Sequence, residues 1–209
     1  MAVAARQVAA PGIEVRPVHD KKEVEVFLHV PWTLGMKEDP NWVPPLLDDY
    51  RRQLDAKKSP FLKHGELACF TAFEAGTPVG RISVQIDREF DRVHPQEPGV
   101  AFFGFFDCPD RLDVARALFA QAEEWALAKG RTRLRGPFTL DTKGEVGVLV
   151  EGFEAPPRIG MASTSRTWGA SSRPQATPRP RTSTPGGTPP VTSTSAPSEW
   201  RRRPRRSRA

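Results

Sequence analysis

The stretch Val100-Ala101-Phe102-Phe103-Gly104-Phe105-Phe106 decides the fold class of this 209-residue sequence. Every residue in it is apolar except one glycine, which is typical of a strand covered on both faces of a sheet. From Asp110 to Lys129, apolar residues recur at helical spacing, and Gly130 is a natural residue to end that helix. A buried strand followed by an amphipathic helix predicts an α/β domain.

Upstream of this stretch, two strand patterns run from Glu66 to Ala75 and from Val79 to Asp87. Because Gly76-Thr77-Pro78 lies between them, we expect a hairpin. Near the N-terminus, Ile13 to Val18 alternates apolar and polar residues. This alternation predicts a short strand whose proline, Pro17, is tolerated at a sheet edge.

Two helices are expected between the first strand and the hairpin. Asp20 with Glu23 three residues later forms a capping-box pattern, so the first helix should begin there and run to about Pro31. The second should lie near Leu46 to Leu54, with Asp48, Asp49, Arg51 and Arg52 on its exposed side.

The remaining part of the domain is predicted to hold one loop and two further strands. Residues Arg88 to Gly99 are charged and contain proline, which indicates a loop. Arg133 to Phe138 predicts a strand, and Val146 to Val150 predicts one more.

Charge and apolar content divide the chain near Met161. Residues 162–209 carry ten arginines and one acid, a net charge of +9, so the whole-chain value of +6 leaves −3 for the first 161 residues. This tail contains no Leu, Ile, Phe or Tyr and eight prolines, so it has little to bury against its ordering entropy. We therefore expect disorder in residues 1–12, a domain over 13–161, and a disordered Pro/Ser/Thr/Arg-rich tail over 162–209.

Several classes of function lack support in the sequence. Cys69 and Cys108 lie in apolar runs without metal or redox spacing, which favours core thiols in a reducing compartment, and the four histidines have no ligand spacing. No apolar run approaches the roughly 18 residues of a membrane span, and residues 1–12 do not resemble a signal peptide. We expect a cytoplasmic protein without a metal and without membrane contact.

The order strand, helix, helix, hairpin, strand, helix, strand resembles the first two thirds of the GNAT acyltransferase fold. The closest resemblance is to bacterial GNAT-like proteins of roughly 370 residues. It rests on Asp39-Pro40-Asn41-Trp42-Val43-Pro44-Pro45, Phe102 to Phe106, Arg135-Gly136-Pro137-Phe138 and Gly147 to Phe153. The resemblance implies a mixed, mostly antiparallel sheet flanked by helices, here incomplete at its C-terminal end.

In this superfamily, the backbone of one strand pairs with the pantetheine of acetyl-CoA, and amides at the next helix N-terminus bind its pyrophosphate. The resemblance therefore implies cofactor contacts from Phe103, Gly104, Phe105, Phe106 and Arg135, although the Phe cluster also suits a core and Arg135 a solvent-facing stripe. The superfamily's glycine-containing phosphate loop is replaced by Asp107-Cys108-Pro109-Asp110-Arg111. Asp107 and Asp110 are better explained as helix caps than as functional carboxylates.

Catalysis by resemblance needs a base, and Glu145 is the candidate if it is buried near the open end of the sheet; a solvated loop acid is the alternative. A late-strand tyrosine often acts as the acid, but Tyr50, the only tyrosine, lies far from those strands in the sequence.

The implied function is acetyl transfer from acetyl-CoA to an amine, on a small molecule or a protein N-terminus, impaired by truncation. The alternatives are a non-catalytic ligand-binding or interaction module, and nucleic-acid binding through the Arg-rich tail if that tail is genuine.

A shifted reading frame is the competing explanation of the tail. If the frame is shifted, the first two bases of each tail codon are the last two bases of a codon in the original frame. A threonine codon begins with AC, so the original codon ends in AC and encodes Tyr, His, Asn or Asp. Under this rule 168–169 permit Leu-Gly, 175–177 permit Ala-Gly-Tyr, and 182–186 permit Asp-Leu-Tyr-Ala-Trp. These segments are similar to the next part of the family's pattern.

Sequencing the coding DNA tests this hypothesis. We expect an open frame, with codons that begin at each tail residue's third base, that encodes these segments at these places. A stop codon in that frame between Trp168 and Thr188 would show instead that the Arg-rich tail is a genuine extension.

Overall fold

The computed structural model describes residues 12–140, 145–148 and 154–157. This part of the chain forms a five-stranded sheet in the order β1-β2-β3-β4-β5. All neighbours are antiparallel except β4 and β5, which are parallel. The predicted mixed, mostly antiparallel α/β sheet is therefore confirmed. The strands are β1 (Ile13–Pro17), β2 (Gly65–Glu74), β3 (Thr77–Asp87), β4 (Val100–Asp107) and β5 (Arg133–Arg135).

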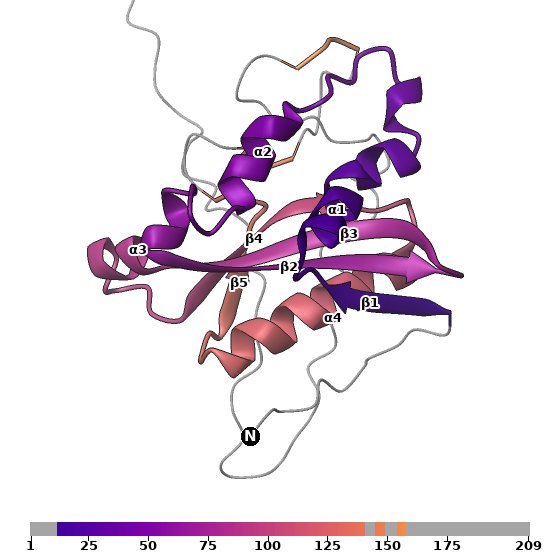
Figure 1. The fold of residues 1–209 in the computed structure, drawn as a ribbon. Helices are drawn as coiled ribbons and strands as arrows, with labels where there is room; N and C mark the ends of the chain where they lie inside the picture. Colours follow the sequence, from indigo (N-terminus) through magenta and orange to yellow (C-terminus); the bar gives the residue numbers. More distant parts are fainter. Residues whose placement is uncertain (1–11, 141–144, 149–153, 158–209) are drawn as a thin grey trace, which may run out of the picture.

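Helices cover both faces of the sheet (Figure 1). α4 (Leu112–Ala128) packs on one face, and α1 (Lys21–Thr33) with α2 (Leu47–Leu54) lies over the other. The larger core cluster joins α4 to β2, β3 and β4, and a smaller one lies under α1. No helix in the described ranges is long and apolar enough to cross a membrane. The smaller cluster contains Phe27, Leu28, Phe61, Cys69, Phe105 and Leu140.

Local sequence signals set the N-terminal elements as expected. The Asp20 carboxylate accepts hydrogen bonds from the backbone amides of Lys22 and Glu23, at 2.7 and 2.8 Å, and the Glu23 carboxylate accepts from the Asp20 amide. The capping box is therefore present and begins α1. Pro31 does not end the helix but lies inside its last part, which continues to Thr33.

The hairpin is confirmed, but its turn is Ala75-Gly76 rather than Gly76-Thr77-Pro78. Both turn residues have positive φ, 47° and 81°, as a tight hairpin turn requires. Pro78 belongs to β3, at a register irregularity opposite Phe73. A bulge tolerates a residue without an N–H, so this proline did not mark the end of the strand.

The expected loop over 88–99 contains a short helix, α3 (Arg88–Val93). The Asp87 carboxylate begins it by accepting from the amides of Glu89 and Phe90. Six residues are too few for an apolar stripe, so the charges of this segment suggested a loop. Both cysteines are buried and free, as expected, and burial raises the pKa of each thiol to about 12.

β5 is shorter than predicted, and the chain then takes another course. Phe138 forms an isolated antiparallel bridge with Val146 instead of extending β5. The expectations for residues 1–11, for 149–150 of the last predicted strand and for the tail over 162–209 lie outside the described residues.

Candidate functional site

Two glycines let the chain after β5 cross against β4. A Cβ on Gly136 would lie 2.4 Å from the Phe103 carbonyl oxygen, and one on Gly104 would lie 2.6 Å from that of Phe138. Such distances exclude any side chain without a backbone shift. At this crossing the Phe138 amide donates to the Phe103 oxygen at 2.6 Å.

The segment that follows the crossing holds Glu145 near the end of β4. The Thr139 amide donates to the Glu145 carbonyl at 2.9 Å, and the Gly147 amide donates to that of Pro137 at 3.0 Å. The Leu140 amide donates to the Gln85 side chain, which lies fully buried on β3. Glu145 is thus bonded to a segment, Phe138 to Leu140, that is itself hydrogen-bonded to β3 at Gln85 and to β4 at Phe103.

A pocket of about 50 Å³ lies where β4 ends, between the α1–α2 layer and the segment that carries Glu145. Its polar side chains are Tyr50, Arg81, Asp107 and Glu145, plus Thr139. Its apolar lining comes from Pro31, Met36, Trp42, Val43, Pro45, Phe105, Phe106 and Pro137.

Tyr50 and Glu145 meet inside this pocket. The Tyr50 hydroxyl donates to Glu145 Oε1 at 3.0 Å, although 95 positions separate the residues in the sequence. Burial raises the pKa of Glu145 above its usual range, and the hydrogen bond from Tyr50 partly opposes that rise. Burial likewise raises the pKa of Tyr50, so its hydroxyl stays protonated. Glu145 is a part-buried pocket carboxyl rather than a solvated loop acid.

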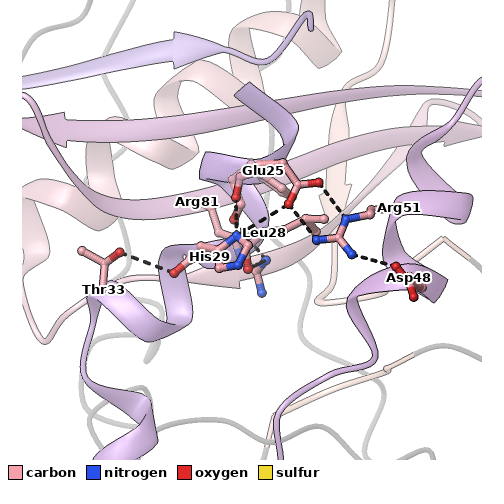
Figure 2. Close-up of polar contacts among 8 residues, drawn as sticks. Glu25, Leu28, His29, Thr33, Asp48, Arg51 and Arg81 are labelled. Carbon is pink, nitrogen blue, oxygen red and sulfur yellow. Dashed lines mark hydrogen bonds and ion pairs between the residues drawn. The ribbon is translucent and has the colours of Figure 1, made fainter. Parts of the chain in front are cut away.

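A buried guanidinium lies beneath this pair. Arg81, on β3, is 5% exposed, and its Nε donates to Asp107 Oδ2 at 2.7 Å. Its Nη1 donates to the carbonyl oxygens of Phe27 and Leu28 on α1, as the contact to Leu28 in Figure 2 shows. The guanidinium also lies over the Phe27 and Phe105 rings.

Asp107 is therefore an ion-pair partner, and the interpretation of it as a helix cap is wrong. The N-cap residue of α4 is Arg111 rather than Asp110, and no side chain caps the helix there.

An ion pair holds α2, and with it Tyr50, against α1 (Figure 2). Arg51 donates to both oxygens of Glu25 at 2.7 and 2.8 Å, and to Asp48 at 2.7 Å. Leu47 and Leu54 of α2 also pack, partly buried, against the smaller core cluster, so these polar contacts add to an apolar attachment. Arg51 was expected on the solvent side, and it faces α1 because Glu25 offers a bidentate partner.

Two curated proteins match somewhat less than three quarters of the chain. A bacterial ceramide synthase from Caulobacter vibrioides is 40% identical over 150 residues, 71% of this chain and 38% of that protein. Protein YghO from Escherichia coli is 36% identical over 154 residues, 74% of this chain and 38% of that one. The match thus spans less than half the length of either relative. No protein-family model matches the chain.

The sheet, in which β4 and β5 form the one parallel pair, is mixed and mostly antiparallel, as the resemblance implied. A tandem GNAT protein from the clavulanic acid biosynthesis pathway is similar over 58% of this chain and 35% of that one, with 21% identity and a TM-score of 0.42. The chain is similar in sequence to these two curated relatives and in fold to GNAT proteins.

The described residues do not fit the pyrophosphate of acetyl-CoA in the manner of GNAT enzymes. Near the start of α4, Arg111 is bound by Glu74 at 2.7 and 2.9 Å and by Asp113 at 2.6 Å. Two acids on one arginine, beside Asp110 and without a glycine, leave this helix start unsuited to a phosphate group.

The other predicted cofactor residues are engaged elsewhere or only partly available. Phe103 offers no free carbonyl because Phe138 occupies it, while Phe105 and Phe106 do line the pocket. Arg135 is ion-paired with Glu97 and lies over the Phe90 ring. Among the described residues, no group of three or more His, Cys, Asp or Glu side chains could hold a metal.

Sequence reasoning missed Tyr50, Arg81 and the role of Asp107. Arg81 left one signal, since it is the only charged residue inside the apolar run from Val79 to Ile86. Tyr50 left none, because nothing near it indicates a partner 95 positions away.

The Arg81–Asp107 pair predicts a stability effect. D107N should lower the free energy of unfolding by about 3 kcal/mol or more, because it leaves a buried guanidinium without its counter-charge. Denaturant titration measures this. The exposed pair of Arg92 and Glu89 provides the control, and E89Q should leave stability nearly unchanged. Equal effects of the two substitutions would contradict the argument.

The start of α4 predicts a ligand effect. About 1 mM acetyl-CoA should not raise the melting temperature of the chain, because a ligand stabilises the native state only if it binds there. A saturable rise measured by scanning calorimetry would show that the chain holds the nucleotide despite Glu74, Asp110 and Asp113.

Proposed function

We propose that the pocket is the acceptor site of an N-acyltransferase and that Glu145 accepts the proton that an amine loses when it becomes an amide. The observation that supports this best is the part-buried Glu145 carboxyl, bonded to Tyr50 inside a pocket at the end of β4. A carboxyl whose pKa is raised by burial is a better proton acceptor near neutral pH than an exposed one.

The charges in the pocket suit an amine. Arg81 is neutralised by Asp107 at 2.7 Å, so an ionised Glu145 leaves the lining with a net negative charge. An ammonium group is attracted to such a site and gives one proton to Glu145, which leaves the neutral amine. As this amine forms the C–N bond, the bond from the acyl carbon to its carrier breaks, and the departing carrier takes up the second proton from nitrogen.

The apolar lining favours a small amine with a hydrocarbon portion over a protein N-terminus as acceptor. Trp42, Val43 and Pro45 supply much of this lining, and Val43 is 51% exposed. The name of the Caulobacter relative points the same way, since a ceramide is an amide of a long-chain amino alcohol and a fatty acid. We infer an acceptor of that general class.

The acyl donor is a separate question, because the residues near α4 do not fit acetyl-CoA. We therefore propose an activated acyl group without assigning its carrier. Because the chain matches only 38% of each relative, we expect lower activity than from a chain that includes the remaining part of the family's pattern.

A non-catalytic ligand-binding module is the second candidate. The arginine bound by two acids near the start of α4 favours it, since that arrangement removes the usual donor site. Such a module would bind amines in the same pocket without forming an amide.

E145Q tests the proposal. The rate of amide formation from a long-chain primary amine, with acetyl and fatty-acyl thioesters as donors, should fall about 100-fold or more, because the amide cannot accept the proton. Mass spectrometry measures the product. In the unsubstituted chain the rate should rise with pH through the raised pKa of Glu145.

Glu89, an exposed glutamate on α3, supplies the matched control, and E89Q should leave the rate unchanged. If the unsubstituted chain binds the amine but forms no amide with any donor, the chain is a non-catalytic amine-binding module and the proposed acyltransferase function is wrong. Equal rates for E145Q and the unsubstituted chain would remove Glu145 from the mechanism.

A further inference from the structure

We propose that Tyr50 is the positioning residue of this site: its hydroxyl holds the Glu145 carboxylate in the pocket and favours the ionised form that can accept a proton. This role rests on the proposed function, but the contact itself can be tested without any acyl transfer. It gives α2, which no motif marked as functional, a part in the chemistry.

The ring of Tyr50 is held by a contact of its own, in addition to the hydrogen bond of its hydroxyl. The ring meets Phe105 edge to face, with centroids 4.8 Å apart and an interplanar angle of 81°. Phe105 has a φ of 41°, an uncommon conformation for a residue with a side chain, at the end of β4 that borders the pocket. The hydroxyl then reaches Glu145 Oε1 at 3.0 Å.

The backbone that carries the ring is held as well. The Tyr50 amide donates to the Leu46 carbonyl at 3.2 Å in the first turn of α2. The next residue, Arg51, binds both oxygens of Glu25 on α1. A phenol held at both its ring and its backbone needs little further ordering to keep its hydrogen bond.

The charges that face Glu145 come from three elements. Arg81 on β3 favours the ionised carboxylate, Asp107 at the end of β4 disfavours it, and the hydrogen bond from Tyr50 on α2 favours it. Because Arg81 is bound directly to Asp107, their effects on Glu145 partly cancel. Among the residues that the structure describes, Tyr50 is thus the one whose side chain makes a favourable contact directly on the carboxylate.

The sign of the effect follows from these contacts. Glu145 can accept a proton only when ionised, and the Tyr50 hydrogen bond lowers its pKa against the rise caused by burial. Removing the hydroxyl must therefore raise the pKa of Glu145. Any loss of activity should be concentrated at low pH and recover as the pH rises through the new value.

Y50F is the decisive variant, because it keeps the ring against Phe105 and removes only the hydroxyl. A 13C NMR titration of glutamate carboxyls in the full chain, with the Glu145 signal assigned by its absence in E145Q, should show a higher midpoint in Y50F. R52Q is the control, since Arg52 lies exposed on the same helix and pairs with Asp49 within α2. It should leave the midpoint in place.

The same variants separate the contact from the function. If amide formation is measurable, the acid limb of its pH profile should move upward in Y50F, with a change of less than about twofold above the limb. If no amide forms but the NMR midpoint still rises in Y50F, the proposed function fails and the Tyr50 contact stands. An unchanged midpoint in Y50F, or an equal rise in R52Q, overturns the positioning role.

A measurement on the unsubstituted chain covers the case in which Y50F does not fold. Tyr50 is the only tyrosine in the sequence, so 13Cζ-labelled tyrosine gives one assigned signal. That signal should titrate with the midpoint of Glu145 and lose this step in E145Q. A signal that does not respond to Glu145 would overturn the proposal.

Discussion

The arrangement of the site depends on one buried ion pair between Arg81 and Asp107. A guanidinium that is 5% exposed carries a large desolvation cost, and it persists only where every side offers a partner. Here the partners come from different layers: a carboxylate at the end of β4, two carbonyl oxygens of α1, and the faces of two phenylalanine rings. The pair therefore joins the sheet to the helical layer that carries the rest of the pocket.

The position of Glu145 follows from backbone geometry rather than from charge. The chain after β5 can cross β4 only because Gly104 and Gly136 carry no Cβ, which would collide with the carbonyl oxygens of Phe138 and Phe103. The buried Gln85 then accepts a hydrogen bond from the Leu140 amide, next to Thr139, which lines the pocket. A polar residue inside a core is costly unless it is hydrogen-bonded, and the bond from Leu140 satisfies the oxygen of the Gln85 side chain.

Local patterns predicted the parts of the fold that local physics decides. The capping box at Asp20, the apolar run of β4, the spacing of α4 and the alternation of the hairpin each specify an element within a few residues. Glu145 was identified through the resemblance, and its burial could not be read from neighbours in a loop. Tyr50 and Asp107 were missed because their partners lie 95 and 26 positions away, and only the sheet and α2 bring them together.

The two ends of the candidate site differ in how fully they are built, and this difference bears on what the molecule can recognise. On the donor side, Arg111 is bound by Glu74 and Asp113, so a phosphate would have to displace two charge-assisted contacts and face the acids that remain. On the acceptor side, Tyr50, Glu145 and the apolar lining form a preorganised pocket. Under the proposed function, the pocket around Tyr50 and Glu145 therefore has to supply most of the binding energy, through its contacts with the acceptor. Under the same proposed function, discrimination among substrates depends on the layer formed by α1, α2 and the segment between them, which the ion pair of Arg81 holds against the sheet.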